Sequence, residues 1–155
     1  MPITLNGTDI TSNKINNSNV SEEKLNGTKV YPSIYTVRFY DFSGGSLLKT
    51  EQVQQGGNAT APANPTRTGY TWLGWDKSYT NVQSNLDVYG TWQINTYTVR
   101  FYDYQGGTIL STQTVNHGAS ATAPTQPTRT GYTWLGWDKD FSNITSNLDI
   151  YGTWQ

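Results

Sequence analysis

Four short stretches of the chain favour β-strands, namely residues 35–41, 47–53, 70–76 and 86–92, and hydrophobic and polar residues alternate in the first, third and fourth of them. In an extended chain successive side chains point to opposite faces, so alternation with a period of two predicts strands with one buried face. The expected inward faces carry Tyr35, Val37 and Phe39 in the first stretch, and Leu86, Val88, Gly90 and Trp92 in the last. In the third stretch, alternation sets Tyr70, Trp72 and Gly74 against Thr71, Leu73 and Trp75.

The segments between these stretches carry turn signals. Gly44-Gly45 supplies the positive φ angles of a hairpin turn between the first two strands. Residues 61–69 hold two prolines, which exclude a strand interior, and end at a glycine suited to a helix terminus or a turn. We expect one short helix there, and therefore an α+β, β-rich fold with one covered sheet face.

The whole pattern occurs twice. Residues 35–93 return as residues 97–155, without a gap and with 40 of the 59 positions identical. A unit of this length is longer than most solenoid repeats and is typical of a small self-contained domain. The sequence therefore predicts an N-terminal segment over residues 1–34 and two repeats, over residues 35–94 and 95–155.

The N-terminal segment is polar and contains two similar cassettes, residues 3–10 and 24–31. Each places Asn-Gly between β-favouring residues, which is a strong signal for a tight hairpin. Such a segment has no core of its own and gains stability by adding strands to a partner. We expect it to dock onto a partner or to self-associate through Leu5, Asn6, Gly7, Thr8, Leu25, Asn26, Gly27 and Thr28.

Composition narrows the classes of function. Ten Lys and Arg stand against eleven Asp and Glu, so no basic surface is expected for nucleic acid or an anionic membrane. The chain has no cysteine, which excludes disulfides and thiolate metal sites. Six Trp, eleven Tyr and four Phe supply the dense apolar material that small domains need.

No residue set indicates catalysis or a cofactor. His117 is the single histidine and its counterpart in the first repeat is Gln55, so it is expected to be a plain surface residue. The recurring Asp41, Asp87, Asp103 and Asp149 fit strand ends and turns better than acid–base chemistry. We therefore expect no enzyme activity and no cofactor or metal.

Aromatic and arginine side chains are the remaining binding candidates. Arg67 and Arg129 precede the Trp-rich strands, and a guanidinium stacked on an aromatic ring is their expected structural role. At least one Trp of each repeat must fill the core. The alternative is a surface for glycan or protein formed by Arg67, Trp75, Arg129 and Trp137.

The motif A-P-x-x-P-T-R-T-G-Y-T-W-L-G-W-D, followed by L-D-[VI]-Y-G-T-W, occurs in both copies. It resembles the Listeria–Bacteroides repeat, the B repeat of internalin-type proteins. The resemblance implies two ubiquitin-like β-grasp modules, found in strings on bacterial surface proteins and without catalytic residues.

The first residues show neither a basic region nor an apolar core typical of a signal peptide, and no anchoring tail follows the second repeat. The N-terminal cassettes also resemble short docking segments of phage fibre proteins. The sequence therefore favours a bacteriophage virion component, namely a head-fibre, decoration or tail-associated protein. We expect it to dock on a capsid or tail protein through residues 1–34 and to form a homo-oligomer there. Its repeats would then be displayed to a host-surface protein or glycan. The alternatives are a secreted or cell-surface bacterial adhesin and a carbohydrate-binding accessory module.

Overall fold

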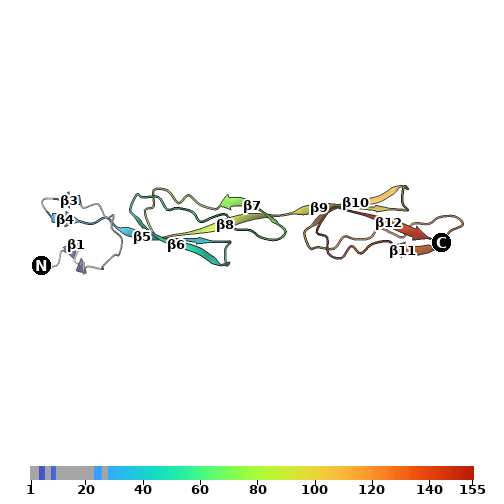
Figure 1. The fold of residues 1–155 in the computed structure, drawn as a ribbon, viewed down its shortest axis with the longest axis horizontal. Helices are drawn as coiled ribbons and strands as arrows, with labels where there is room; N and C mark the ends of the chain where they lie inside the picture. Colours follow the sequence, from blue (N-terminus) through green and yellow to red (C-terminus); the bar gives the residue numbers. More distant parts are fainter. Residues whose placement is uncertain (1–3, 6–7, 10–22, 26–27) are drawn as a thin grey trace.

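The computed structural model describes residues 4–5, 8–9, 23–25 and 28–155, and in this part of the chain every regular element is a β-strand. Two four-stranded sheets, one for each repeat, follow one another along the long axis of the molecule (Figure 1). The C-terminus lies at the end of this axis away from the first repeat (Figure 1). The repeats are therefore arranged as a rod.

The strands of the N-terminal segment form two short hairpins. In the first, β1 (Thr4–Leu5) pairs with β2 (Thr8–Asp9), and in the second, β3 (Glu23–Leu25) pairs with β4 (Thr28–Val30). Each pair flanks an Asn-Gly dipeptide, as the sequence predicts. The Asn-Gly residues themselves, Asn6-Gly7 and Asn26-Gly27, lie outside the described residues.

The sheet of the first repeat has the strand order β6-β5-β8-β7. Its central strands β5 (Ile34–Tyr40) and β8 (Leu86–Ile94) are parallel, and β6 (Leu47–Gln54) and β7 (Tyr70–Trp75) join them antiparallel at the edges. The second repeat has the same order. Its strands are β9 (Thr96–Tyr102), β10 (Ile109–Asn116), β11 (Trp134–Trp137) and β12 (Leu148–Trp154).

The prediction of a short helix between the second and third strands was wrong. Residues 58–67 form neither helix nor strand. Pro62 and Pro65 explain this, because each proline pushes the residue before it toward an extended conformation and lacks the N–H that a helical turn needs. The domains are therefore β-rich without an α-helix, so the helix that belongs to the β-grasp expectation is missing.

The core is covered by irregular chain instead of a helix. The connection after β6 brings Ala59 under the sheet, and the connection after β7 brings Val82, and both side chains are buried. The two connections are hydrogen-bonded to each other, with Val82 N donating to Gly57 O at 2.8 Å and Ala59 N donating to Tyr79 O at 2.9 Å. These bonds satisfy backbone groups that a buried loop would otherwise leave unpaired.

The predicted inward faces of the central strands are confirmed. The first core contains Val37, Phe39, Val53 and Val88, and the second contains Val99, Phe101, Val115 and Ile150, all of them buried. Phe39, Phe101 and Ile150 have no exposed surface at all. The two cores share no residue, so each repeat has its own apolar interior.

A chain of aromatic rings crosses each interior. In the first repeat it runs from Tyr79 through Phe39, Trp75 and Trp72 to Trp92, with ring centroids 5.0–5.4 Å apart in edge-to-face contacts. Edge-to-face packing brings the positive edge of one ring to the negative face of the next. The second repeat repeats the chain with Phe141, Phe101, Trp137, Trp134 and Trp154.

The alternation predicted for the third strand, which placed Trp72 and Trp75 on opposite faces, was wrong. A β-bulge lies between Trp72 and Gly74, so Trp72 pairs with Trp92 and Trp75 pairs with Gly90. The extra residue, Leu73, puts Trp72 and Trp75 on the same face, where their rings touch. Gly74 has a φ of +119°, which side-chain-bearing residues rarely adopt, and this permits the bulge.

The sequence also predicts that Trp92 and its counterpart in the second repeat, Trp154, lie on the inward face of their strands, and both indoles pack on the sheet. The indole N–H of Trp154 donates to Asp103 O at 2.7 Å, and that of Trp92 donates to Asp41 O at the same distance. Gly152 makes room for the neighbouring ring, because a Cβ there would lie 2.5 Å from Trp134 Cζ3.

We expect Trp154→Ala to lower the free energy of unfolding of the second repeat by about 3 kcal/mol, the low end for an aromatic deletion because the ring is only half-buried. Trp154→Phe keeps most of the ring packing and removes the hydrogen bond to Asp103, so it should cost nearer 1 kcal/mol. Urea unfolding followed by far-UV circular dichroism measures both. A loss below about 1 kcal/mol for Trp154→Ala would show that this ring does not contribute to the core.

Candidate binding surface

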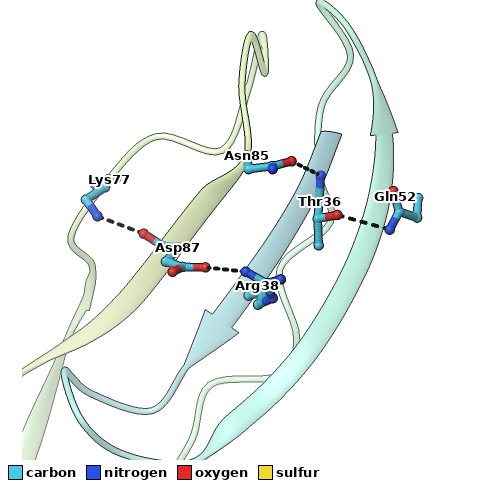
Figure 2. A network of polar contacts seen from close by, with 6 residues as sticks. All are labelled: Thr36, Arg38, Gln52, Lys77, Asn85 and Asp87. Carbon is cyan, nitrogen blue, oxygen red and sulfur yellow. Dashed lines mark hydrogen bonds and ion pairs between the residues drawn. The ribbon is translucent and has the colours of Figure 1, made fainter. Parts of the chain in front are cut away.

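The face of each sheet opposite the core carries a ladder of polar side chains. In the first repeat, Arg38 Nη1 lies 3.4 Å from Asp87 Oδ1, and the amide of Gln52 donates to Thr36 Oγ1 at 3.1 Å. Figure 2 shows that these side chains cross the three neighbouring strands β6, β5 and β8. The Arg38 and Asp87 side chains are 45% and 41% exposed, so the ladder faces solvent.

Two further contacts fix the ends of this ladder. Asn85, just before β8, accepts a hydrogen bond from Thr36 N at 2.8 Å, and Lys77 Nζ donates to Asp87 O at 2.7 Å (Figure 2). Asn85 thereby holds the start of β8 against β5. Lys77 holds the connection after β7 against β8.

A pair of tyrosines lies beside the ladder. Tyr40 and Tyr89 are register partners on the parallel strands β5 and β8, and their rings are stacked with centroids 5.2 Å apart. The Lys77 ammonium lies 5.1 Å from the centre of the Tyr89 ring, within cation–π range. The surface therefore has aromatic, hydroxyl, amide and ion-paired groups side by side.

The second repeat reproduces the same surface. Arg100 Nη1 lies 3.4 Å from Asp149 Oδ1, Asn147 Oδ1 accepts from Thr98 N, and Tyr102 packs on Tyr151 with ring centroids 5.0 Å apart. Thr114 stands where the first repeat has Gln52. We call these two surfaces the outer faces. Reasoning from sequence did not single them out, although the alternation already placed Arg38 and Tyr40 on the solvent side.

Arg67 and Trp75, which the sequence suggests as ligand residues, have intramolecular contacts. The Arg67 guanidinium lies 3.9 Å from the Tyr70 ring centre and 4.6 Å from that of Phe42. Trp75 packs against Phe39 and Trp72 at the margin of the core. Arg129 and Trp137 have the corresponding contacts in the second repeat. The stacking of arginine on aromatic rings follows the expected structural role, and a ligand role for the four residues stays a prediction.

The predicted docking residues of the N-terminal segment fall partly outside the described chain. Leu5 pairs with Thr8, and Leu25 pairs with Thr28, within the two short hairpins. Asn6, Gly7, Asn26 and Gly27 are not among the described residues. Docking by this segment remains a prediction.

Within the described residues, no group of three or more His, Cys, Asp or Glu side chains is placed to hold a metal ion. In the same part of the chain, no buried side-chain nitrogen or oxygen lacks a hydrogen-bond partner. No helix there is long and apolar enough to cross a membrane.

The Glu51 carboxylate has a shifted pKa and ties the irregular connection to the edge strand. Partial burial raises the pKa of Glu51, but hydrogen bonds from Thr60 N and the Lys49 ammonium outweigh this and leave the pKa below its ordinary value of 4.5. The carboxylate accepts at 2.8 Å from Thr60 N and at 2.9 Å from Lys49 Nζ. In the second repeat the neutral Gln113 makes both contacts to Thr122, donating to its O and accepting from its N.

Comparison with known families finds the model of the Listeria–Bacteroides repeat domain at residues 35–92 and again at residues 97–151. These two matches cover more than half of the chain and coincide with the two sheets. The expectation from the G-Y-T-W-L-G-W-D motif is confirmed.

Similar proteins come from bacteria. Two proteins of Evansella cellulosilytica, named "Putative membrane protein" and "Putative Gly-rich membrane protein", are 29% and 27% identical over 142 and 143 residues, each covering 79% of this chain. Internalin H of Listeria monocytogenes is 33% identical over 87 residues, covering 49% of this chain. The chain spans 21%, 16% and 15% of these relatives' lengths. A phage role, which the sequence favoured, has no support among them.

We expect the Glu51 contacts to make the first repeat sensitive to acid. Because the folded pKa is lowered, the charged form stabilises the fold at pH values above 4.5, and this contribution is lost as the pH falls through the lowered value. Glu51→Gln should thus be less stable than the wild type at pH 7, by less than about 1 kcal/mol for a partly exposed group. Near pH 3 the difference should disappear or reverse.

Urea unfolding at both pH values measures this difference, and carboxylates common to both proteins cancel in the comparison. Gln113→Glu is the matched control in the second repeat. Ser111 stands where the first repeat has Lys49, so the new charge would face the Thr122 carbonyl without a cation. This variant should be destabilised at pH 7 and recover at low pH. A Glu51→Gln difference independent of pH would contradict the assignment.

Proposed function

The chain belongs to the Listeria–Bacteroides repeat family, and we propose that it is a non-enzymatic spacer and display segment of a bacterial surface protein. The repeats supply length and stiffness, and their outer faces supply surfaces for adhesion to protein or glycan. Of the hypotheses drawn from the sequence, the bacterial surface adhesin is closer to this proposal than the phage virion component. The reason is that the relatives include internalin H and two proteins named as membrane proteins.

The observation that carries the proposal is the link between the repeats. Strand β8 ends at Ile94 and β9 begins at Thr96, so Asn95 alone separates them. Asn95 N donates to Gly69 O of the first repeat, and Asn95 O accepts from His117 N of the second, both at 2.8 Å. A single linker residue bonded to both domains leaves little freedom for bending, which is a property useful in a spacer.

The same link sets the direction in which the outer faces point. Inward residues carry even numbers in β8 (Leu86, Val88) and odd numbers in β9 (Val99, Phe101). In Figure 1, β7 lies above β8 in the first repeat, whereas its counterpart β11 lies below β12 in the second. Both observations indicate that successive repeats turn their outer faces to opposite sides of the rod. Such an arrangement suits contacts with several neighbours at once.

Stiffness of the link can be measured with spin labels, since the chain has no native cysteine. We expect Ser43→Cys and Gln105→Cys, at equivalent exposed turns, to give one narrow distance distribution in double electron–electron resonance. Inserting Gly-Gly after Asn95 should broaden it, because the bonds to Gly69 and His117 then no longer restrain one another. A broad distribution in the parent chain would contradict the spacer role.

The location of the protein on the cell surface is tested in a separate experiment. Antibodies raised against the chain should label intact cells of the bacterium that encodes it, and protease treatment of those cells should remove the label. Labelling that appears only after lysis would contradict the proposal. Labelling of purified phage particles instead would support the virion role and docking through residues 1–34.

A further inference from the structure

The joint between the repeats consists of two complementary surfaces. The trailing end of the first repeat contributes Gly69 and Thr71, and the leading end of the second contributes Asn95, Tyr97 and His117. Thr71 Oγ1 donates to Asn95 Oδ1 at 2.7 Å, in addition to the backbone bond from Asn95 N to Gly69 O. Asn95 is therefore hydrogen-bonded to the first repeat through both its side chain and its backbone.

His117 covers the glycine of the trailing end. A Cβ added to Gly69 would lie 2.1 Å from His117 Cδ2 and 2.5 Å from Cγ, so the imidazole rests directly on this residue. The ring is held from its own side by Tyr97, whose hydroxyl lies 3.3 Å from Nδ1. The single histidine thus has a structural position that its expected role as a plain surface residue did not include.

The leading end is built the same way in both repeats. Gln55 N donates to Ser33 O at 2.7 Å in the first repeat, as His117 N donates to Asn95 O in the second. The backbone arrangement therefore belongs to the fold, and the side chains at the positions of Asn95 and His117 distinguish one leading end from another.

The trailing end of the second repeat has the form of the surface that His117 covers. Gly131 has a φ of +79°, close to the +76° of Gly69, and a Cβ added to it would meet nothing within 4 Å. Thr133 is held in place by reciprocal backbone bonds with Gln155, of 2.7 and 3.0 Å. Gly131 and Thr133 are exposed, and Tyr132 between them is 51% exposed, whereas Gly69 and Tyr70 are half-buried.

We propose that Gly131, Tyr132 and Thr133 form a docking surface for the leading end of another repeat of this family, linked in tandem through an Asn-containing joint with an imidazole over Gly131. The first repeat supplies the precedent, because the equivalent surface there is covered in this way. A tethered repeat is held at high effective concentration, so a contact of a few residues is sufficient to order the joint. The inference deepens the proposed spacer role by extending it to longer arrays.

The test appends a further copy of residues 94–155 after Gln155, which reproduces the natural Ile94-Asn95 link. In the extended chain the imidazole of the added repeat should lie over Gly131. Ring currents should then shift the α-protons of Gly131 in the same direction and by a similar amount as those of Gly69. Spin labels at the position of Gln105 in the second and the added repeat should give the same narrow distance as the Ser43–Gln105 pair.

Gly131→Ala and Gly69→Ala form a matched pair, because both glycines have nearly the same positive φ and thus the same backbone strain. In the parent chain, Gly69→Ala should broaden the distance between the repeats, and Gly131→Ala should leave it unchanged. In the extended chain, Gly131→Ala should broaden only the second distance.

An unshifted Gly131 signal and a broad second distance, beside a narrow first distance, would overturn the docking surface while leaving the spacer role intact. Broad distances at both joints would overturn the two proposals together.

Discussion

The edge-to-face chain of aromatic rings is the interaction on which each repeat depends. A domain of this size buries a smaller fraction of its surface than a larger domain does, and in a chain without cysteine no disulfide compensates for this, so a dense core is needed. Phe39 is fully buried between Trp75 and Tyr79, and the chain of rings continues through Trp72 to Trp92 on the central strand β8. The rings connect the inner strand β5, the edge strand β7 and the connection that follows it.

Several backbone features follow from the size of these rings. Gly90 has to lack a side chain, because a Cβ there would lie 2.3 Å from Asp41 O and 2.5 Å from Trp72 Cζ3. The bulge at Leu73 and Gly74 turns a second tryptophan inward, so that one short edge strand contributes two rings. Leu73 is displaced outward by the same bulge and is 60% exposed. With tryptophans filling the space between sheet and connections, an irregular covering chain is sufficient and no helix is required.

Duplication of the repeat places two equivalent outer faces on one molecule. The outer faces are sheet surfaces satisfied by their own ion pairs and hydrogen bonds, and their exposed pairs contribute little to stability. They are repeated along a rod whose joint is held by Asn95, Gly69 and His117. The same joint relates the trailing end of one repeat to the leading end of the next, so the spacing and the direction of the faces are set together.

The sequence alone determined the repeat, the family, the four strands of each unit and the inward faces of the central strands. These properties depend on local alternation and on turn residues such as Gly44-Gly45, which act within a few positions. The two faces of the third strand could not be assigned in the same way, because a bulge reverses the alternation and is recognised only when β7 is paired with β8. The helix expected over residues 61–69 failed because local turn signals do not reveal that two connections pair beneath the sheet.

The tertiary structure alone decided the partners of residues far apart in the sequence. It placed Arg38 beside Asp87 and Tyr40 beside Tyr89, because β5 and β8 are parallel neighbours although 49 positions separate their register partners. It also placed His117 on Gly69, a contact across the joint that no pattern within one repeat contains. Sequence periodicity records which side of a strand is buried. The strand order and the angle of the joint decide which groups meet, because they depend on packing of the whole chain.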